Sequence, residues 1–258
     1  YNLESDLIHI SVENLDLELI SKEMKEKGFY ICENLINLDL INPISDYWKK
    51  RFSVLNENKP KTKMVRGNFH LGEKDFDSYS KNNKWHLYRI FKFYWNLPES
   101  AEDKMTREIA MDLHRIKNVL NGNHPSYALG YHFNGDGTYL SLSHYPPNDG
   151  FIHFHPDNLS YGRIYQFMVN LTYKNIDYKE GGLHIVINKN KIDVDKYMKP
   201  GSVLFYDGGY EHGVEPVKSD TSLGRIAFFS IPASFFSNKE IPNFIRLIEK
   251  VYFKIHRS

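Results

Sequence analysis

The feature that most constrains the fold of this chain is a change in its sequence pattern near residue 125. Beyond it, short apolar stretches alternate with turn residues such as Asn148-Asp149-Gly150 and Lys199-Pro200-Gly201. Apolar runs of this length between Gly, Pro and Asn clusters are typical of strands. That pattern, over roughly 100 residues, favours a sandwich or a jelly-roll barrel. We expect strands at 138–145, 151–155, 163–173, 182–187, 202–206, 213–217 and 224–231.

Helical periods dominate before residue 125. The clearest helix is expected over 101–120, where apolar residues recur every three or four positions. Ser100 and Asp103 resemble a capping box at its start, and Asn121-Gly122 ends it.

Further elements are expected on either side of that helix. The pattern predicts a helix over 15–27 that ends at Gly28, a strand over 28–36 and a helix over 37–52, whose start Pro43 delays. A last amphipathic helix is expected over 242–255. We therefore expect one compact domain of class α+β. It has a mainly helical support at 1–125, a barrel core at 126–236 and a C-terminal helix at 237–258.

Composition limits the classes of partner. The chain has 12 histidines beside one cysteine, so a bound metal would need histidine and carboxylate ligands. Lys plus Arg (33) nearly equals Asp plus Glu (32), which argues against nucleic acid and acidic membranes as partners. No apolar run approaches the roughly 18 residues that cross a bilayer. We expect a cytoplasmic protein, monomeric or homodimeric, that acts on a small molecule.

The segment 151–157 contains the first candidate metal ligands. His155 and Asp157 lie two residues apart, and strand side chains alternate, so both project to one face. His212 follows 57 residues later, just before another predicted strand. Two histidines and one carboxylate on one face leave three octahedral positions open, as in the facial triad of non-haem Fe(II) oxygenases.

Arg225 lies thirteen residues after His212 in an otherwise apolar strand. A buried guanidinium needs a partner, because leaving it unpaired costs several kcal/mol. Its planar fork matches a carboxylate in bidentate fashion. We interpret the missing carboxylate as the distal end of a bound dicarboxylic acid.

These residues make the barrel region, about 138–232, resemble the Fe(II)/2-oxoglutarate-dependent dioxygenases. The nearer likeness is to their prolyl-hydroxylase-like and phytanoyl-CoA-hydroxylase-like branches. The resemblance implies a double-stranded β-helix core, the jelly-roll of cupin-like proteins. It also implies that His155, Asp157 and His212 bind Fe(II) and form the catalytic centre.

The same resemblance implies a cosubstrate site. Arg225 matches the basic residue that holds the C5 carboxylate of 2-oxoglutarate, and Tyr145 has the spacing of a tyrosine near that cosubstrate. Many relatives have Ser or Thr two residues after the Arg, whereas this chain has Ala227. A second hydrogen bond to the carboxylate would then come from Tyr145, Tyr165 or Asn170.

The implied reaction uses Fe(II), 2-oxoglutarate and O2, releases succinate and CO2, and hydroxylates a C–H bond of the substrate. Asp157 favours hydroxylation over halogenation, because halogenating relatives replace the triad carboxylate with a small residue. Desaturation, ring closure and epimerisation stay open. We expect a small polar substrate such as a metabolite, a sugar or a natural-product intermediate.

The basic segment 59–89 is open to two interpretations. It contains Arg66 and His70, which we interpret as substrate-binding residues of a loop that covers the site. The alternative is a solvated basic loop.

Two other functions compete with the hydroxylase. A triad oxidase would take its electrons from the substrate and need no 2-oxoglutarate; Arg225 argues against it. A catalytically inactive jelly-roll binding module would have lost the metal, and Cα atoms of His155 and His212 more than about 10 Å apart would favour it.

Overall fold

The computed structural model describes residues 3–57, 74–79, 85–94, 97–130, 136–147, 150–157, 165–221 and 223–234. Its longer helices are α1 (Leu17–Lys27), α2 (Leu38–Glu57) and α3 (Ala101–Leu120). Short 3-10 helices lie at Leu3–Asp6, Val12–Asn14 and Asp195–Tyr197. The strands are β1 (Phe29–Cys32), β2 (Lys74–Tyr79), β3 (Trp85–Phe93), β4 (Asp136–Tyr145), β5 (Phe151–His155), β6 (Tyr165–Asn170), β7 (Glu180–Ile187), β8 (Asn190–Asp193), β9 (Val203–Asp207), β10 (His212–Lys218) and β11 (Arg225–Ser234).

Local chemistry explains where α1 begins and ends. The Asp16 side chain accepts a hydrogen bond from the Leu19 amide at 2.9 Å, which caps the first turn. Gly28 follows the last turn with φ +78°, and its amide donates to the Met24 carbonyl. A Cβ at Gly28 would also lie 2.8 Å from Ile187 Cδ1, so the positive φ and the close packing both favour glycine. The predicted end of this helix is confirmed.

The expectation that Pro43 delays α2 is wrong. The helix begins at Leu38 and contains Pro43. Proline in a helix removes the hydrogen bond to the carbonyl four residues earlier, here that of Asp39. Both Pro43 and Asp39 are exposed, so water can satisfy that carbonyl.

Helix α3 has the predicted bounds, but its capping box is only half formed. Ser100 Oγ accepts from the Asp103 amide at 3.1 Å. The Asp103 carboxylate, however, accepts from the Glu99 amide rather than from that of Ser100. Asp103 also pairs with Arg107 and lies 3.5 Å from the Lys92 ammonium of β3, which attaches this end of α3 to the sheet.

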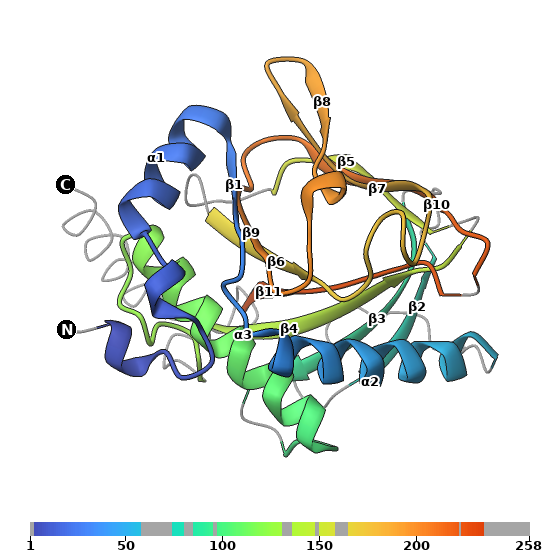
Figure 1. Cartoon of the computed structure of the whole chain (residues 1–258), viewed down its shortest axis with the longest axis horizontal. Coiled ribbons are helices and arrows are strands. Elements are labelled where there is room, and N and C mark those ends of the chain that lie inside the picture. The colour runs from blue at the N-terminus through green and yellow to red at the C-terminus, as the bar shows by residue number, and fades with distance from the viewer. Residues whose placement is uncertain are drawn as a thin grey trace.

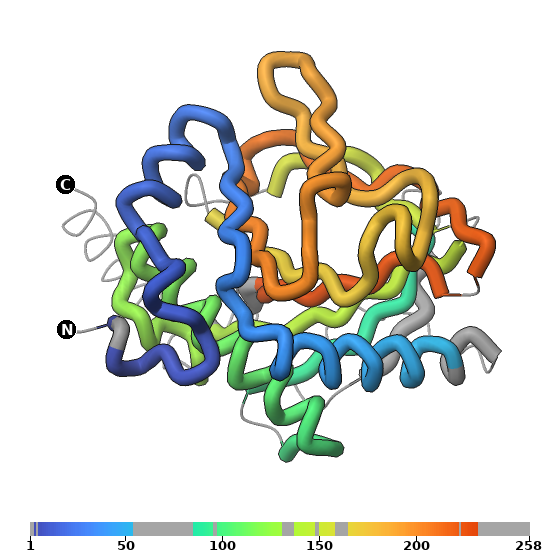
Figure 2. The backbone as a smooth tube through the Cα atoms, viewed as in Figure 1, coloured from blue at the N-terminus to red at the C-terminus, as the bar shows by residue number. Residues whose placement is uncertain are grey.

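The strands form a double-stranded β-helix, as predicted. Their order is β1-β9-β6-β11-β4-β3-β5-β10-β7-β8, and β2 pairs with β3. Figure 1 shows α2 and α3 along the sheet that contains β4, with the β7–β8 hairpin projecting on the opposite side. In Figure 2, β1 from the beginning of the chain lies beside β9, and the two pair antiparallel from Phe29↔Tyr206 to Cys32↔Val203.

Strand β3 corrects the interpretation of 59–89 as a loop throughout. It pairs with β4 from Tyr88↔His144 to Phe93↔Tyr139, and with β5 at Trp85↔Ile152 and His86↔Phe151. It therefore joins the two sheets of the barrel. The strand is rich in aromatic and branched residues, a β-type composition that the basic residues around it obscured. Strand β8 was also not predicted.

Two main apolar clusters lie on opposite faces of the strands. One joins Trp48 of α2 and Leu113 of α3 to Leu142 of β4. The other joins Tyr145 of β4 to Leu204 of β9 inside the barrel. Because side chains alternate along a strand, β4 supplies both clusters. Polar side chains on the Tyr145 face therefore point into the barrel.

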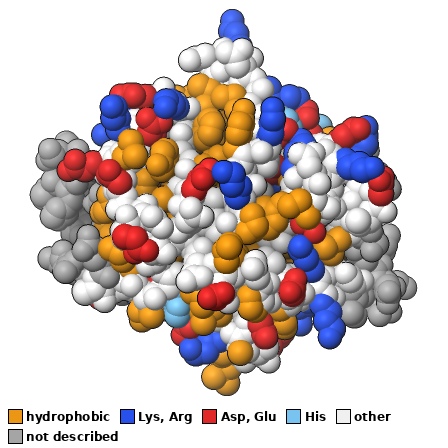
Figure 3. All heavy atoms as spheres, viewed as in Figure 1, with side chains coloured by type: hydrophobic (Ala, Val, Ile, Leu, Met, Phe, Trp, Pro, Cys, Tyr) orange, Lys and Arg blue, Asp and Glu red, His pale blue; other side chains and the backbone are white. Residues whose placement is uncertain are grey.

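The surface carries mixed charges. Acidic and basic side chains are interspersed over the face drawn in Figure 3, in keeping with the formal net charge of +1. Within the described ranges, no helix is both long and apolar enough to span a bilayer. The helix predicted at 242–255, within the predicted C-terminal region 237–258, lies outside the described residues.

Candidate metal centre

The three predicted metal ligands come together at one end of the barrel. His155 ends β5 and His212 begins β10, and the two are direct partners in the antiparallel pairing of these strands. Asp157 follows two residues after β5. One potential donor atom from each of the three residues lies within 4.8 Å of the other two, so one ion could contact all three.

Both imidazoles are held in the tautomer that a metal needs. His155 Nδ1 lies 2.7 Å from the His153 carbonyl oxygen, and His212 Nδ1 lies 2.9 Å from that of Tyr210. A carbonyl can only accept, so each Nδ1 carries the hydrogen and donates. In the neutral rings each Nε2 then keeps its lone pair, the arrangement found at metal-binding histidines.

A backbone hydrogen bond and the side-chain amide of Gln166 position Asp157. Its amide donates to the Gly208 carbonyl at 2.8 Å, which ties the end of β5 to the β9–β10 turn. Oδ1 lies 3.8 Å from His212 Nε2, while Gln166 Nε2 approaches Oδ2 at 3.4 Å. One carboxylate oxygen thus faces the histidine and the other is supported from β6.

The surroundings keep His212 neutral. Its side chain is buried, and the Tyr206 ring packs edge-on against it with centroids 5.1 Å apart. Burial lowers the pKa of His212, although the nearby Asp157 carboxylate opposes that shift. A neutral imidazole is the form that binds a metal ion.

Arg225 is fully buried and held by residues of its own chain. Its Nε donates to Asp195 Oδ2 at 2.6 Å and its Nη2 to Asp195 Oδ1 at 3.1 Å. Burial by itself would lower the pKa of Arg225, but Asp195 raises it above the ordinary value. The inference that its partner carboxylate must come from a bound dicarboxylic acid is therefore wrong, because Asp195 supplies one. Nη1 is buried and has no hydrogen-bond partner in the described part of the chain.

Asp195 is the centre of a buried polar network. Besides Arg225, it accepts hydrogen bonds from Asn170 Nδ2, the Tyr178 hydroxyl and the Leu183 amide at 2.7–2.8 Å. Burial would raise its pKa, but these donors and Arg225 lower it. Gly182 makes the network possible: its φ is +99°, and a Cβ there would lie 2.5 Å from Asp195 Oδ2.

The structure gathers two of the three predicted helper residues near Arg225. The Arg225 guanidinium lies 5.4 Å from the centre of the Tyr145 ring, and Asn170 Oδ1 accepts from Arg225 Nη2 at 3.0 Å. Tyr165 is not brought there. It alternates with Gln166 on β6 and packs against the outer apolar cluster, on the face that points away from Arg225.

Two residues on the barrel interior were not predicted as functional. Asp195 lies in a short 3-10 helix far from Arg225 in sequence, and no local pattern links the two. Arg89 was taken as part of the basic loop but lies on β3, where Leu87 of the same face belongs to the inner cluster. Arg66 and His70, the predicted substrate-binding residues, lie outside the described residues.

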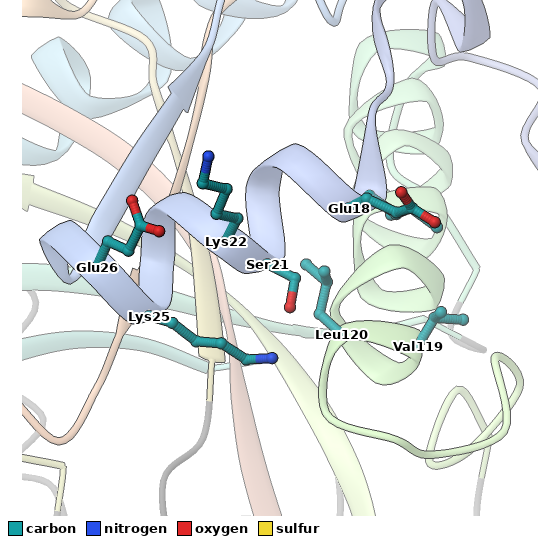
Figure 4. A pocket seen from close by; sticks show the side chains of 8 residues that line it. Glu18, Ser21, Lys22, Lys25, Glu26, Val119 and Leu120 are labelled. Atoms are coloured by element: carbon teal, nitrogen blue, oxygen red, sulfur yellow. The ribbon is translucent and has the colours of Figure 1, made fainter.

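A separate surface pocket lies between α1 and α3 (Figure 4). Glu18, Lys22, Lys25 and Glu26 of α1 line it, and Val119 and Leu120 close it on the α3 side. None of the residues that line it belongs to the triad or to the Arg225 network.

Comparison with known proteins places the fold. It is similar to the crystal structure of a Pseudomonas putida prolyl-4-hydroxylase, with a TM-score of 0.52 and 16% identity over 83% of this chain and 97% of that one. AviO1 from Streptomyces viridochromogenes Tue57 gives a TM-score of 0.54 and 11% identity over 88% and 97% of the two chains. EvdMO1 gives 0.51 and 15%, over 84% of this chain and 50% of the other.

These likenesses show a shared fold. The sequence itself matches no known family profile and none of the curated proteins. One fold can support many functions, so the function of this chain depends on the residues of its site.

Proposed function

We propose that this protein is a non-haem Fe(II)- and 2-oxoglutarate-dependent dioxygenase that hydroxylates a C–H bond of a small polar molecule. The observation that carries the proposal is the triad of His155, Asp157 and His212, with both Nε2 atoms free to bind a metal. Two neutral imidazoles and one carboxylate, presented from one side, suit Fe(II) and leave coordination positions open for reactants. The fold similarity to a prolyl-4-hydroxylase supports the same class.

The donor set fits this metal on chemical grounds. It lacks thiolates, because the one cysteine, Cys32, is buried on β1 and is not part of the triad. Fe(II) together with 2-oxoglutarate and O2 would supply the oxidant for C–H hydroxylation and release succinate and CO2. His155, Asp157 and His212 would hold the ion.

The remaining residues have positioning roles in this proposal. Tyr206 and Gln166 fix the orientation of His212 and Asp157. The inner apolar cluster, which includes Leu204 and Ile185, lines the barrel below them and limits the access of water. Exclusion of water protects a reactive oxidant from side reactions, so an apolar wall beside a metal site suits an oxygenase.

The geometry weighs against the inactive binding module, and a binding experiment separates the proposal from the triad oxidase. Directly paired residues of an antiparallel ladder have Cα atoms about 4.5–5.5 Å apart, far less than the separation that would favour a binding module without metal. The triad oxidase differs from the proposal only in needing no 2-oxoglutarate. Calorimetric titration of the metal-loaded protein with 2-oxoglutarate distinguishes the two, because the oxidase would show no binding.

The proposal is tested by removing single ligands. We expect Asp157→Ala and His212→Ala to weaken Fe(II) binding by more than roughly 100-fold, because losing a ligand costs more than losing its hydrogen-bonded support. Metal binding is measured by calorimetry without oxygen, and succinate formation is measured with a panel of small polar substrates. Both should be lost while the circular dichroism spectrum is kept.

His124→Ala is the matched control, since His124 is exposed and lies outside the barrel strands. It should bind Fe(II) like the unsubstituted protein. Equal Fe(II) affinity in all three variants would overturn the proposal.

A further inference from the structure

Two of the described arginines lie on the inner face of the barrel, and one of these two is neutralised by a carboxylate. Arg225 is paired in bidentate fashion with Asp195, and both side chains are fully buried. Arg89 has no carboxylate partner within the part of the chain that the structure describes. Burial lowers the pKa of Arg89, the neighbouring Tyr145 side chain opposes that shift, and Arg89 Nε is buried without a hydrogen-bond partner among the described residues. The unneutralised positive charge in this part of the barrel is therefore on Arg89.

Strand register places Arg89 on the same inner face of the barrel as Arg225. Arg89 lies opposite Ser143 on β4, Ser143 opposite Ala227 on β11, and Ala227 opposite Asn170 on β6. Two residues further along the same inner face, Tyr145 of β4 pairs with Arg225 of β11. The Tyr145 side chain neighbours both guanidinium groups. The two arginines thus flank one tyrosine on the inner face.

The same strand register suggests how a carboxylate could be bound near Ala227. That position lacks the hydroxyl that the resemblance leads one to expect, but the buried hydroxyl of Ser143 lies on the strand directly opposite. In this register the small Ala227 side chain lies between Ser143 and Asn170. A carboxylate there would find hydroxyl and guanidinium donors on several sides.

We propose that Arg89 supplies the positive charge that binds the distal carboxylate of the dicarboxylic cosubstrate, while the Arg225–Asp195 pair forms the adjoining wall. This inference rests on the proposed function, because it concerns the ligand of the same site. A carboxylate beside Arg225 alone would meet a pair whose charges already cancel, whereas one beside Arg89 meets an uncompensated cation. Arg89 is thus a ligand-binding residue, and Asp195 holds Arg225 in place.

The test separates the distal carboxylate from metal chelation. Mn(II)-loaded protein is titrated by calorimetry with two ligands: the non-reactive N-oxalyl analogue of 2-oxoglutarate, which has a distal carboxylate, and oxalate, which has none. In Arg89→Met, we expect binding of the N-oxalyl analogue to weaken by roughly 10- to 100-fold, the worth of a charge-assisted hydrogen bond. Oxalate affinity should stay the same.

Controls cover folding and net charge. Arg115→Met removes a partly exposed arginine of α3 and should leave both affinities unchanged. Arg89→Lys keeps the positive charge but lacks the planar guanidinium group. Its ratio of N-oxalyl analogue affinity to oxalate affinity should therefore lie between the ratios of the unsubstituted protein and of Arg89→Met. If Arg89→Met fails to fold, the ratio measured on Arg89→Lys decides.

The outcomes distinguish the two proposals. A folded Arg89 variant whose affinity ratio equals that of the unsubstituted protein would overturn the role of Arg89 and leave the dioxygenase proposal standing. Failure of the unsubstituted protein to bind Mn(II), or to bind either ligand once loaded, would overturn both.

Discussion

At the residue scale, the Arg225–Asp195 pair shows how a single buried charge shapes its surroundings. Five hydrogen bonds converge on the Asp195 carboxylate: two from Arg225 and one each from Asn170, Tyr178 and Leu183. A buried ion pair is not a large source of stability by itself. Removing one partner is costly, however, because the other charge is then left in an apolar interior.

Removing the negative charge of Asp195 should therefore destabilise the fold. Asp195→Asn keeps the shape of the side chain but leaves Arg225 without a counter-charge, so we expect a loss of about 3 kcal/mol or more in the free energy of unfolding at pH 7. Urea denaturation measures it. The matched control is Asp220→Asn, which breaks the exposed pair with Lys179 and should cost less than about 1 kcal/mol. Equal losses in the two variants would contradict the assigned role of Asp195.

The sequence predicted the residues of the metal centre but not this pair. His155 and Asp157 are near neighbours on a strand, so alternation alone places them on one face. The need of Arg225 for a carboxylate was also predicted, but the choice of Asp195 was not. Thirty residues separate the two, and only the barrel brings the 3-10 helix that contains Asp195 under β11.

At the scale of elements, α3 places a buried ammonium beside the barrel. Lys117 lies in the last turn of the helix, is 4% exposed, and its Nζ has no hydrogen-bond partner among the described residues. Burial lowers the pKa of Lys117 from its ordinary value of 10.5 to about 8, and the Asp157 charge opposes the shift only in part. Because the unfolded chain binds this proton more tightly, protonation of Lys117 favours unfolding.

The sign of the pH dependence follows. Between pH 8 and 10.5 the unfolded chain holds a proton that the folded chain has lost, so this contribution to stability rises with pH and is flat below 8. We expect Lys117→Met to stabilise the metal-free protein at pH 7 by roughly 3 kcal/mol or less, at about 1.4 kcal/mol per pKa unit. The gain should vanish towards pH 10.5.

Urea denaturation at pH 7, 9 and 10.5 checks this difference. Lys104→Met, at an exposed site on the same helix, serves as the control and should change stability little at any of these pH values. A gain for Lys117→Met that does not depend on pH would show that lost charge is not its cause.

The helices were easier to predict than the strand that joins the sheets. Helix α3 has both an apolar period and end signals within its own sequence, and its bounds agree with those expected. Strand β3 packs apolar residues on both faces, with Leu87 inside the barrel and Ile90 against the helices. Burial on two sides removes the regular alternation of polar and apolar positions, and Arg89 and Lys92 interrupt the apolar run.

At the scale of the whole molecule, the candidate metal centre lies where β5 and β10 meet. A bound ion would link two strands that are distant in sequence and would bind the folded chain only. Ligand binding to the folded state alone raises stability by RT ln(1 + [L]/Kd), about 2.7 kcal/mol at a hundredfold excess over Kd.

We therefore expect Mn(II) to raise the thermal midpoint of the protein and a chelator to reverse the effect. Asp157→Ala should show no rise at the same Mn(II) concentration. Differential scanning calorimetry at several concentrations gives the apparent Kd. A rise of equal size in the unsubstituted protein and in Asp157→Ala would show that the ion binds elsewhere.

The sequence alone predicted the type of fold and the three candidate metal ligands, because turn residues, strand alternation and the His-x-Asp spacing act over a few neighbouring positions. The tertiary structure decided which charges meet. Arg225 is paired by Asp195, Arg89 reaches the barrel interior on β3, and Tyr165 faces outward. Such pairings depend on strand register and on which elements pack together, and these are set by burial over the whole molecule rather than by any local stretch of sequence.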